Sequence, residues 1–176
     1  MLDVAVAYNR YRFLGDEFLT WLWFIIETQS DEIRNLDQDP FLLEIGNRMA
    51  LENRRSNALE TITIKGDDAG LEEGIMALKK GALITELNLV FRIAEQKWQF
   101  SIKGESLNIS GLKTPETARP ETKEEVEGFV LEKIYLYDKL IQFFDVLFKR
   151  FVHQRTSDRW DSEVIPRIRN WISTAA

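Results

Sequence analysis

The sequence predicts an α+β fold, with a mostly antiparallel sheet of about five strands, one crossing helix, a Trp-rich N-terminal helix and a long C-terminal helical pair. Three observations lead to this prediction. Apolar and polar residues alternate over several short segments between residues 41 and 112, as they do in strands. Residues 68–80 have apolar positions at helical spacing, and residues 122–154 keep that spacing without a proline. With 176 residues, of which 44% are hydrophobic, the chain is long enough to bury one core.

We therefore expect a single domain over residues 1–176. Its parts are an N-terminal helical segment (1–37), a sheet with its helix (38–113) and the C-terminal helices (121–174). There is no internal repeat and no low-complexity tract, so nothing divides the chain into smaller units.

The N-terminal segment combines a weak strand signal with a strong helix signal. Apolar side chains alternate from Leu2 to Tyr8, which predicts a short strand. From Asp16 to Thr28 one helical stripe is apolar, and Trp21 and Trp23 widen it, so we expect this helix to be buried on most sides. An acidic linker, residues 30–40, follows and ends in a proline.

The next segment has the two-residue period of strands. Phe41 to Ile45 alternate up to Gly46-Asn47, and the alternation resumes as far as Leu51, which predicts a hairpin with a Gly/Asn turn. A polar turn, Asn53 to Asn57, reverses the chain again. A β-branched strand over residues 59–64 comes next and stops at a glycine.

A helix and three strands complete the predicted sheet. Residues 68–80 carry acidic side chains in the first helical turn, two lysines in the last and Gly81 as a C-terminal stop, which match the helix dipole. Two long strands follow over residues 83–93 and 97–102, and a short one is expected over residues 107–112.

The C-terminal region predicts one long helix. A linker bracketed by Pro115 and Pro120 precedes a helix from about Thr122 to Gln154, roughly 48 Å long at 1.5 Å per residue. The first of its two apolar stripes comprises Val126, Val130, Ile134, Tyr137, Ile141, Phe144, Phe148 and Phe151. The second comprises Phe129, Leu136, Leu140, Phe143 and Leu147. An arc this wide must be buried against both the sheet and another helix, or against another chain.

A short last helix closes the chain. Ser157 or Asp158 is expected to cap it, and Pro166 lies near its start. Its inward-facing residues are predicted to be Val164, Ile168, Trp171 and Ile172.

Composition excludes several classes of protein. The chain has no cysteine, so it forms no disulfide, zinc-thiolate site, iron–sulfur cluster or thiol nucleophile. The start of the sequence lacks the basic and apolar pattern of an export signal. The most apolar run, Phe18 to Ile26, is far shorter than the roughly 20 residues that a membrane span needs. We therefore expect a cytoplasmic protein that makes no contact with a membrane.

No catalytic or cofactor motif is present. The single histidine, His153, has no nucleophile at a motif spacing and is expected on a helix surface. The acidic clusters at 37–39 and 67–73 are better explained by linker solubility and helix capping than by metal binding. Gly66, Gly70 and Gly74 match no phosphate-binding pattern, so close packing is their expected use. We expect no cofactor, no metal and no enzymatic activity.

Charge is unevenly distributed. The whole chain has a net charge of −6, whereas residues 149–176 have six basic and three acidic side chains, a net charge of +3. This end is the one sizeable basic region, and clustered Lys and Arg are what phosphate contacts need. A solvated helix end beside an acidic partner surface explains the same pattern. The candidate DNA contacts here are Arg150, Arg155, Arg159, Arg167 and Arg169.

Two segments carry a resemblance to a known family. They are EEGIMALKKGALITEL (72–87), a helix that runs through a glycine into a strand, and KWQFSIKGESLNISGL (97–112), its aromatic-rich partner. With the strands before them and the long helix after them, residues 49–151 resemble the C-terminal half of the recombination-associated protein RdgC. The opening FLGDEFLTWLWF (13–24) is similar to a segment of longer RdgC-like proteins.

The resemblance implies a nucleoid-associated, non-enzymatic protein that encircles double-stranded DNA as a dimer, binds without sequence preference and restrains recombination. It also implies a homo-oligomer, or a second chain that supplies the larger N-terminal half of the family. Lys65 is the one DNA-binding residue carried over from the family. Here Gly66-Asp67-Asp68 follows it, which places carboxylates where the family has hydrogen-bond donors.

Two functions remain open at this point. The first is RdgC-like, sequence-independent binding of double-stranded DNA that modulates recombination. The alternative is a protein-interaction module, such as a phage or mobile-element accessory factor, that has lost DNA binding and uses its apolar long helix for oligomerisation or for a partner. An enzyme ranks behind both because the sequence supplies no nucleophile, base and orienting group together.

Overall fold

The computed structural model describes residues 13–34, 40–53, 60–66 and 68–175. Within them the predicted α+β fold is confirmed: five antiparallel strands form one sheet in the order β2-β1-β3-β4-β5. The strands are β1 Phe41–Asn53, β2 Glu60–Lys65, β3 Leu83–Ile93, β4 Gln96–Lys103 and β5 Ile109–Lys113. The helices are α2 Phe13–Thr28, α3 Ser30–Arg34, α4 Asp68–Lys79, α5 Lys123–Arg155 and α6 Ile165–Thr174, with a π-helical turn, Trp160–Val164, before α6.

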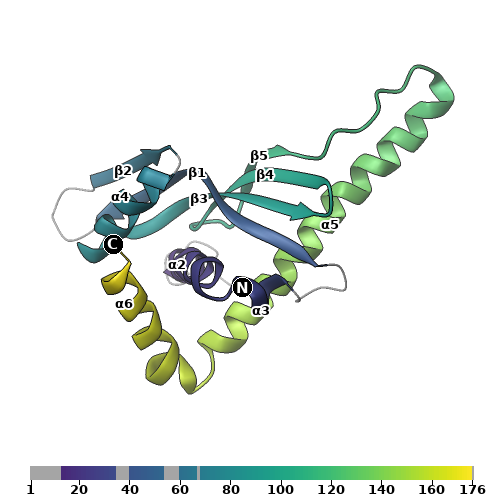
Figure 1. Cartoon of the computed structure of the whole chain (residues 1–176). Coiled ribbons are helices and arrows are strands. Elements are labelled where there is room, and N and C mark those ends of the chain that lie inside the picture. Colours follow the sequence, from purple (N-terminus) through teal and green to yellow (C-terminus); the bar gives the residue numbers. More distant parts are fainter. Residues whose placement is uncertain (1–12, 35–39, 54–59, 67, 176) are drawn as a thin grey trace, which may run out of the picture.

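Helix α2 is the centre of the molecule. It lies between the sheet, α5 and α6 (Figure 1), and every residue from Phe18 to Ile26 except Thr20 is buried. The indole of Trp21 donates a hydrogen bond to Gln154 of α5 (2.8 Å), and the ring of Trp23 meets Trp171 of α6 edge to face at 5.3 Å. The expectation that this helix is covered on most sides is confirmed, and the apolar surface of its tryptophans joins three parts of the chain in one core.

The C-terminal half of α5 is fixed to the sheet by its second apolar stripe. Phe143 stacks on Phe91 of β3 at 4.1 Å between ring centroids and meets Phe41 of β1 edge to face at 4.6 Å. Leu136, Leu140 and Leu147 of the same stripe are also buried. The burial predicted for this stripe is therefore confirmed from Leu136 onward.

The predicted hairpin at Gly46-Asn47 is wrong. Strand β1 continues through these residues, and its pairing with β3 shifts between Ile45 and Met49, which is a bulge. Glycine is typical of a bulge as well as of a turn, and a bulge leaves the alternation of apolar and polar residues on both sides intact. The side chain of Asn88 fills the space beside Gly46, where a Cβ atom would lie 2.0 Å from its Oδ1.

The predicted cap of the last helix is also wrong. Neither Ser157 nor Asp158 caps it with a side chain, because the hydroxyl of Ser157 donates instead to the carbonyl of Gln154 (2.7 Å). The chain re-enters helix through the π-helical turn, where Trp160 is buried against Phe151. The helix therefore restarts where the Trp160 indole packs into the core, and a capping pattern in the sequence gives no information about this packing. The inward position of Ile168 and Trp171 is confirmed.

The glycines have different roles. A Cβ on Gly74 would lie 2.6 Å from Sδ of Met49 and 2.8 Å from the Trp23 ring, so close packing is confirmed there. At Gly66 the prediction is wrong, because nothing lies within 4 Å and a φ of +144° explains the glycine instead. The surroundings of Gly70, the predicted strand at Leu2–Tyr8 and the acidic pair Asp37 and Asp39 fall outside the described residues.

Candidate interaction surface

The N-terminal part of α5 extends beyond the sheet. Figure 1 shows the coil 114–122 and the start of α5 projecting from the rest of the molecule as an arm. We define the arm as residues 114–135, since Leu136 is the first buried residue of α5. The Trp98 indole donates to the carbonyl of Leu136 at 3.1 Å, which ties the helix to β4 at this point.

The arm has a defined start and a covered side. Thr122 caps α5 by accepting a hydrogen bond from the amide of Glu125 (3.3 Å), and the Glu125 carboxylate accepts one from the amide of Glu121 (2.8 Å). Lys133 donates to the hydroxyl of Thr114 (3.0 Å) and lies over the Phe129 ring. The coil therefore runs along one side of the helix and leaves the opposite side exposed.

That exposed side is apolar. Five residues of the first predicted stripe lie on it and are between 45% and 60% exposed; we call them the α5 stripe, and they are Val126, Val130, Ile134, Tyr137 and Ile141. Leu131 borders the stripe beside Ile134, Tyr135 lies one turn further along beside Leu131, and both are equally exposed. Neither belongs to a predicted stripe, although the helical angle of Leu131 next to Ile134 would have identified it.

The same stripe is buried further along α5. Phe144 meets Phe100 edge to face at 5.2 Å, Phe148 meets Phe18 at 5.3 Å, and Phe151 is fully buried. The first stripe therefore fills the protein's own core in its C-terminal half and has no cover within the described chain in its N-terminal half. Burial against the same chain is therefore confirmed for the C-terminal half of this stripe, and burial against another chain stays a prediction for its N-terminal half.

Three of the candidate DNA-binding arginines form ion pairs with carboxylates. Arg150 pairs with Glu32 at 2.9 Å, Arg155 with Glu17 at 2.6 Å, and Arg159 with Glu163 at 3.7 Å. Arg155 also lies over the ring of Trp160. The side chains of Arg150 and Arg155 are only 21% and 32% exposed, so these two stabilise the packing of α5 on α3 and α2.

The other candidate cations are exposed. Arg167 and Arg169 lie on α6, where Arg167 covers the Phe24 ring, and Lys65 ends β2 at the edge of the sheet. No ion pair joins any of these three to another residue within the described ranges. The six candidates are thus spread over α5, the turn after it, α6 and β2.

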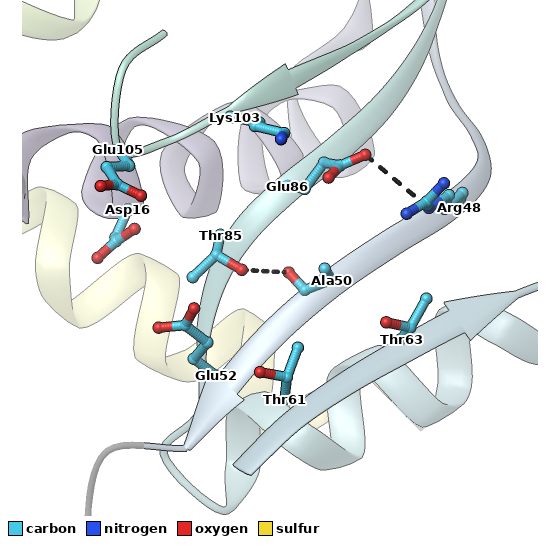
Figure 2. Close-up of a pocket in the computed structure, with 10 residues that line it drawn as sticks. All are labelled: Asp16, Arg48, Ala50, Glu52, Thr61, Thr63, Thr85, Glu86, Lys103 and Glu105. Carbon is cyan, nitrogen blue, oxygen red and sulfur yellow. Dashed lines mark hydrogen bonds and ion pairs between the residues drawn. The ribbon is translucent and has the colours of Figure 1, made fainter. Parts of the chain in front are cut away.

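A polar hollow lies on the outer face of the sheet (Figure 2). Thr61 and Thr63 of β2 face it, with charged residues of β1, β3 and β4 beside them. Arg48 lies 3.8 Å from Glu86, and Thr85 donates to the carbonyl of Ala50 at 3.3 Å. The charged part of the lining comprises four carboxylates and two basic side chains, so the hollow does not suit an anion such as a phosphate group.

The described residues offer no site for catalysis on a metal. They contain no group of three or more side chains suited to hold a metal ion, and His153 lies exposed on α5, as expected. None of the described helices has the length and apolarity to cross a membrane. Comparison of the chain with protein-family models, with curated proteins and with solved structures finds no match in any of the three. The resemblance to RdgC stays a prediction from the quoted segments.

Proposed function

We propose that the protein is a protein-interaction module and that the α5 stripe is the surface with which it binds another polypeptide. The observation that carries the proposal is the half-exposed state of seven large apolar side chains on one projecting helix. A contiguous apolar patch of this kind on a folded protein marks an interaction site.

The energetics of an isolated helix support this. A helix in water is marginal without tertiary contacts, and most of its stability comes from packing an apolar face. Among the residues between Lys123 and Tyr135 whose burial is described, only Phe129 and Lys133 are partly covered by the rest of the protein. Completing the burial of one side chain of this size contributes about 1 kcal/mol or more. A bound partner would therefore stabilise the arm as well as hide its apolar surface.

Binding of double-stranded DNA is the second function that we propose. It is supported by the exposed, unpaired positions of Lys65, Arg167 and Arg169 among the described residues. It ranks second because Arg150 and Arg155 would have to leave Glu32 and Glu17 before either reached a phosphate. The net charge of −6 also gives the molecule no long-range attraction for DNA.

The test of the first proposal is a comparison of two charge insertions. Ile134→Asp places a carboxylate in the middle of the α5 stripe, and Met76→Asp places one at a similarly exposed apolar position on α4. We expect the wild type and the α4 variant to retain the same polypeptide, either a further copy or a different chain, and the α5 variant to lose it. Equal retention by all three folded proteins would remove the stripe from the interface.

A further inference from the structure

We propose that the polypeptide bound by the α5 stripe is a second copy of this chain, whose α5 packs antiparallel to the first about a two-fold axis between Ile134 and Tyr137. This inference rests on the proposed function, since it names the partner of that surface. Four observations support it: the spacing of the stripe, its uncovered length, the charges at its two ends and its area.

The spacing of the stripe matches another helix. Val130, Ile134, Tyr137 and Ile141 follow one another at intervals of four, three and four residues, and Phe144 and Phe148 continue the alternation. This is the seven-residue repeat of helices that pack side by side at a shallow angle. The described part of the chain exposes one such helix face, on α5.

The length of the stripe suits a two-fold pair. In an antiparallel arrangement about the proposed axis, Ile134 of each copy faces Tyr137 of the other, and Val130 faces Ile141. Residues 114–117 of the coil line a hollow together with Glu132 and Leu136, which lie at least about 120° around α5 from the middle of the stripe, so this part of the coil does not obstruct the second helix. Lys133, which donates to Thr114, borders the stripe between Val130 and Tyr137. Each copy thus covers the exposed half of the other copy's stripe.

The charges at the ends of the stripe favour the antiparallel direction. Lys123 lies about five helical turns before Ile141 and so on the same face, and Asp145 lies within about 40° of that face at the other end. Antiparallel packing brings Lys123 of one copy within about one turn of Asp145 of the other, twice in each dimer. Asp145 already pairs with Lys149 of its own helix at 2.6 Å, so Lys123 would share this carboxylate with Lys149. A parallel pair in register would instead place lysine beside lysine and aspartate beside aspartate.

The area suits a weak dimer. The five stripe residues and Leu131, each about half exposed, offer roughly 500 Å² per copy, if about 170 Å² is taken for each when fully exposed. Standard interfaces bury about 800 Å² per partner, and the flanking Glu127, Asp138 and Gln142 supply further surface. We expect a reversible dimer that dissociates on dilution.

The first experiment measures mass by sedimentation velocity from micromolar to near-millimolar concentration. We expect the wild type and Met76→Asp to dimerise as the concentration rises and Ile134→Asp to stay monomeric with an unchanged circular dichroism spectrum. A dimer that persists in Ile134→Asp, or a wild type that is monomeric throughout, overturns the inference. If that monomer still retains a different polypeptide that Ile134→Asp loses, the proposed function stands without it; if not, both fail.

The second experiment tests the direction of the helices. Lys123→Glu and Asp145→Lys should each raise the dimer dissociation constant by about 2–5-fold, and the double variant should return it to within about two-fold of the wild type. Single variants without effect, or a double variant without recovery, exclude the antiparallel pairing of charges.

A spin-label distance provides an independent check of direction. The chain has no cysteine, and a side chain at Gly128 would meet nothing within 4 Å, so Gly128→Cys carries a nitroxide without disturbing the fold. Gly128 lies nine residues, or 2.5 helical turns, before Tyr137 and so faces away from the stripe, which places the two labels on the outer sides of the helix pair. In the antiparallel dimer they are also offset by about 22 Å along the helix axis, whereas in a parallel dimer they lie level and are separated only by the width of the pair, about two helix diameters (~20 Å). The shorter separation would overturn the proposal.

Discussion

The indole N–H of Trp98 donates to the main-chain carbonyl of Leu136 at 3.1 Å, and both groups are buried. This bond marks the point on α5 where the anchored half of the helix ends and the arm begins. Because the Leu136 carbonyl lies in the middle of a continuous helix, the Trp98 bond adds to the helical hydrogen bonds and does not interrupt them. The length of the arm therefore depends on a residue of β4.

We expect Trp98→Phe to lower the free energy of unfolding by about 1–3 kcal/mol. The phenyl ring fills most of the space but leaves a cavity and removes the hydrogen-bond donor from a buried carbonyl. Urea denaturation followed by circular dichroism measures this change. Tyr135→Phe, at an exposed position of the same helix, is the control and should change stability by less than about 0.5 kcal/mol. Equal stabilities for the two variants would contradict the anchoring role of Trp98.

Two glycines in helices should respond to alanine with opposite signs. Gly74→Ala forces a methyl group against Met49 and Trp23, and overpacking of this kind costs about 1–3 kcal/mol. Gly128→Ala adds a methyl group in open space on α5, where the helix propensity of alanine contributes about 0.5–1 kcal/mol. Thermal melts of both variants beside the wild type test the pair, and a stabilised Gly74→Ala protein would show that α4 does not pack on α2 as described.

Two residues of the same apolar stripe should behave differently in the monomer. Phe148→Ala removes a ring packed on Phe18 and should cost about 2–4 kcal/mol of unfolding free energy. Ile141→Ala, at 60% exposure, should leave the stability of the monomer almost unchanged. Chemical denaturation, at a protein concentration too low for dimerisation, measures the stability of both variants. If Ile141→Ala were as destabilising as Phe148→Ala, the face that we describe as exposed would be covered within the chain.

Gel-shift titrations with unrelated duplexes test the DNA-binding proposal. If DNA is a ligand, the affinities should be similar for all sequences and fall steeply with salt, and Arg167→Glu and Arg169→Glu should weaken them several-fold. Arg150→Glu should weaken binding less and lower stability instead, because Arg150 pairs with Glu32. The absence of any shift at low salt would remove this function and leave the interaction module alone.

Regular elements could be predicted closely from the sequence. Helix 68–80 is observed as Asp68–Lys79, and the long helix starts and ends within one residue of the expected positions, because caps, charges and period agree there. Gly46-Asn47 was misjudged because a turn and a bulge share their signals. Local pattern identifies an element but does not say what lies next to it.

The candidate surface could be predicted only in part. The sequence shows two apolar stripes on α5, yet it does not show which half of the first stripe the sheet and α2 would cover, since that depends on where Trp98 and Phe18 come to lie. The partners of Arg150 and Arg155 are also remote, at Glu32 and Glu17. No local charge count reveals that these arginines are already paired.

The enclosure of α2 has a consequence for synthesis of the chain. Its tryptophans meet Trp171 and Phe151, so the most apolar segment emerges from the ribosome well before two of its covering surfaces, α5 and α6, are synthesised. Until then the nascent polypeptide presents this segment to its surroundings, where a chaperone that holds apolar stretches can bind it. Removing residues 165–176, which include α6, should therefore leave a product that aggregates in the cell even though every strand is intact.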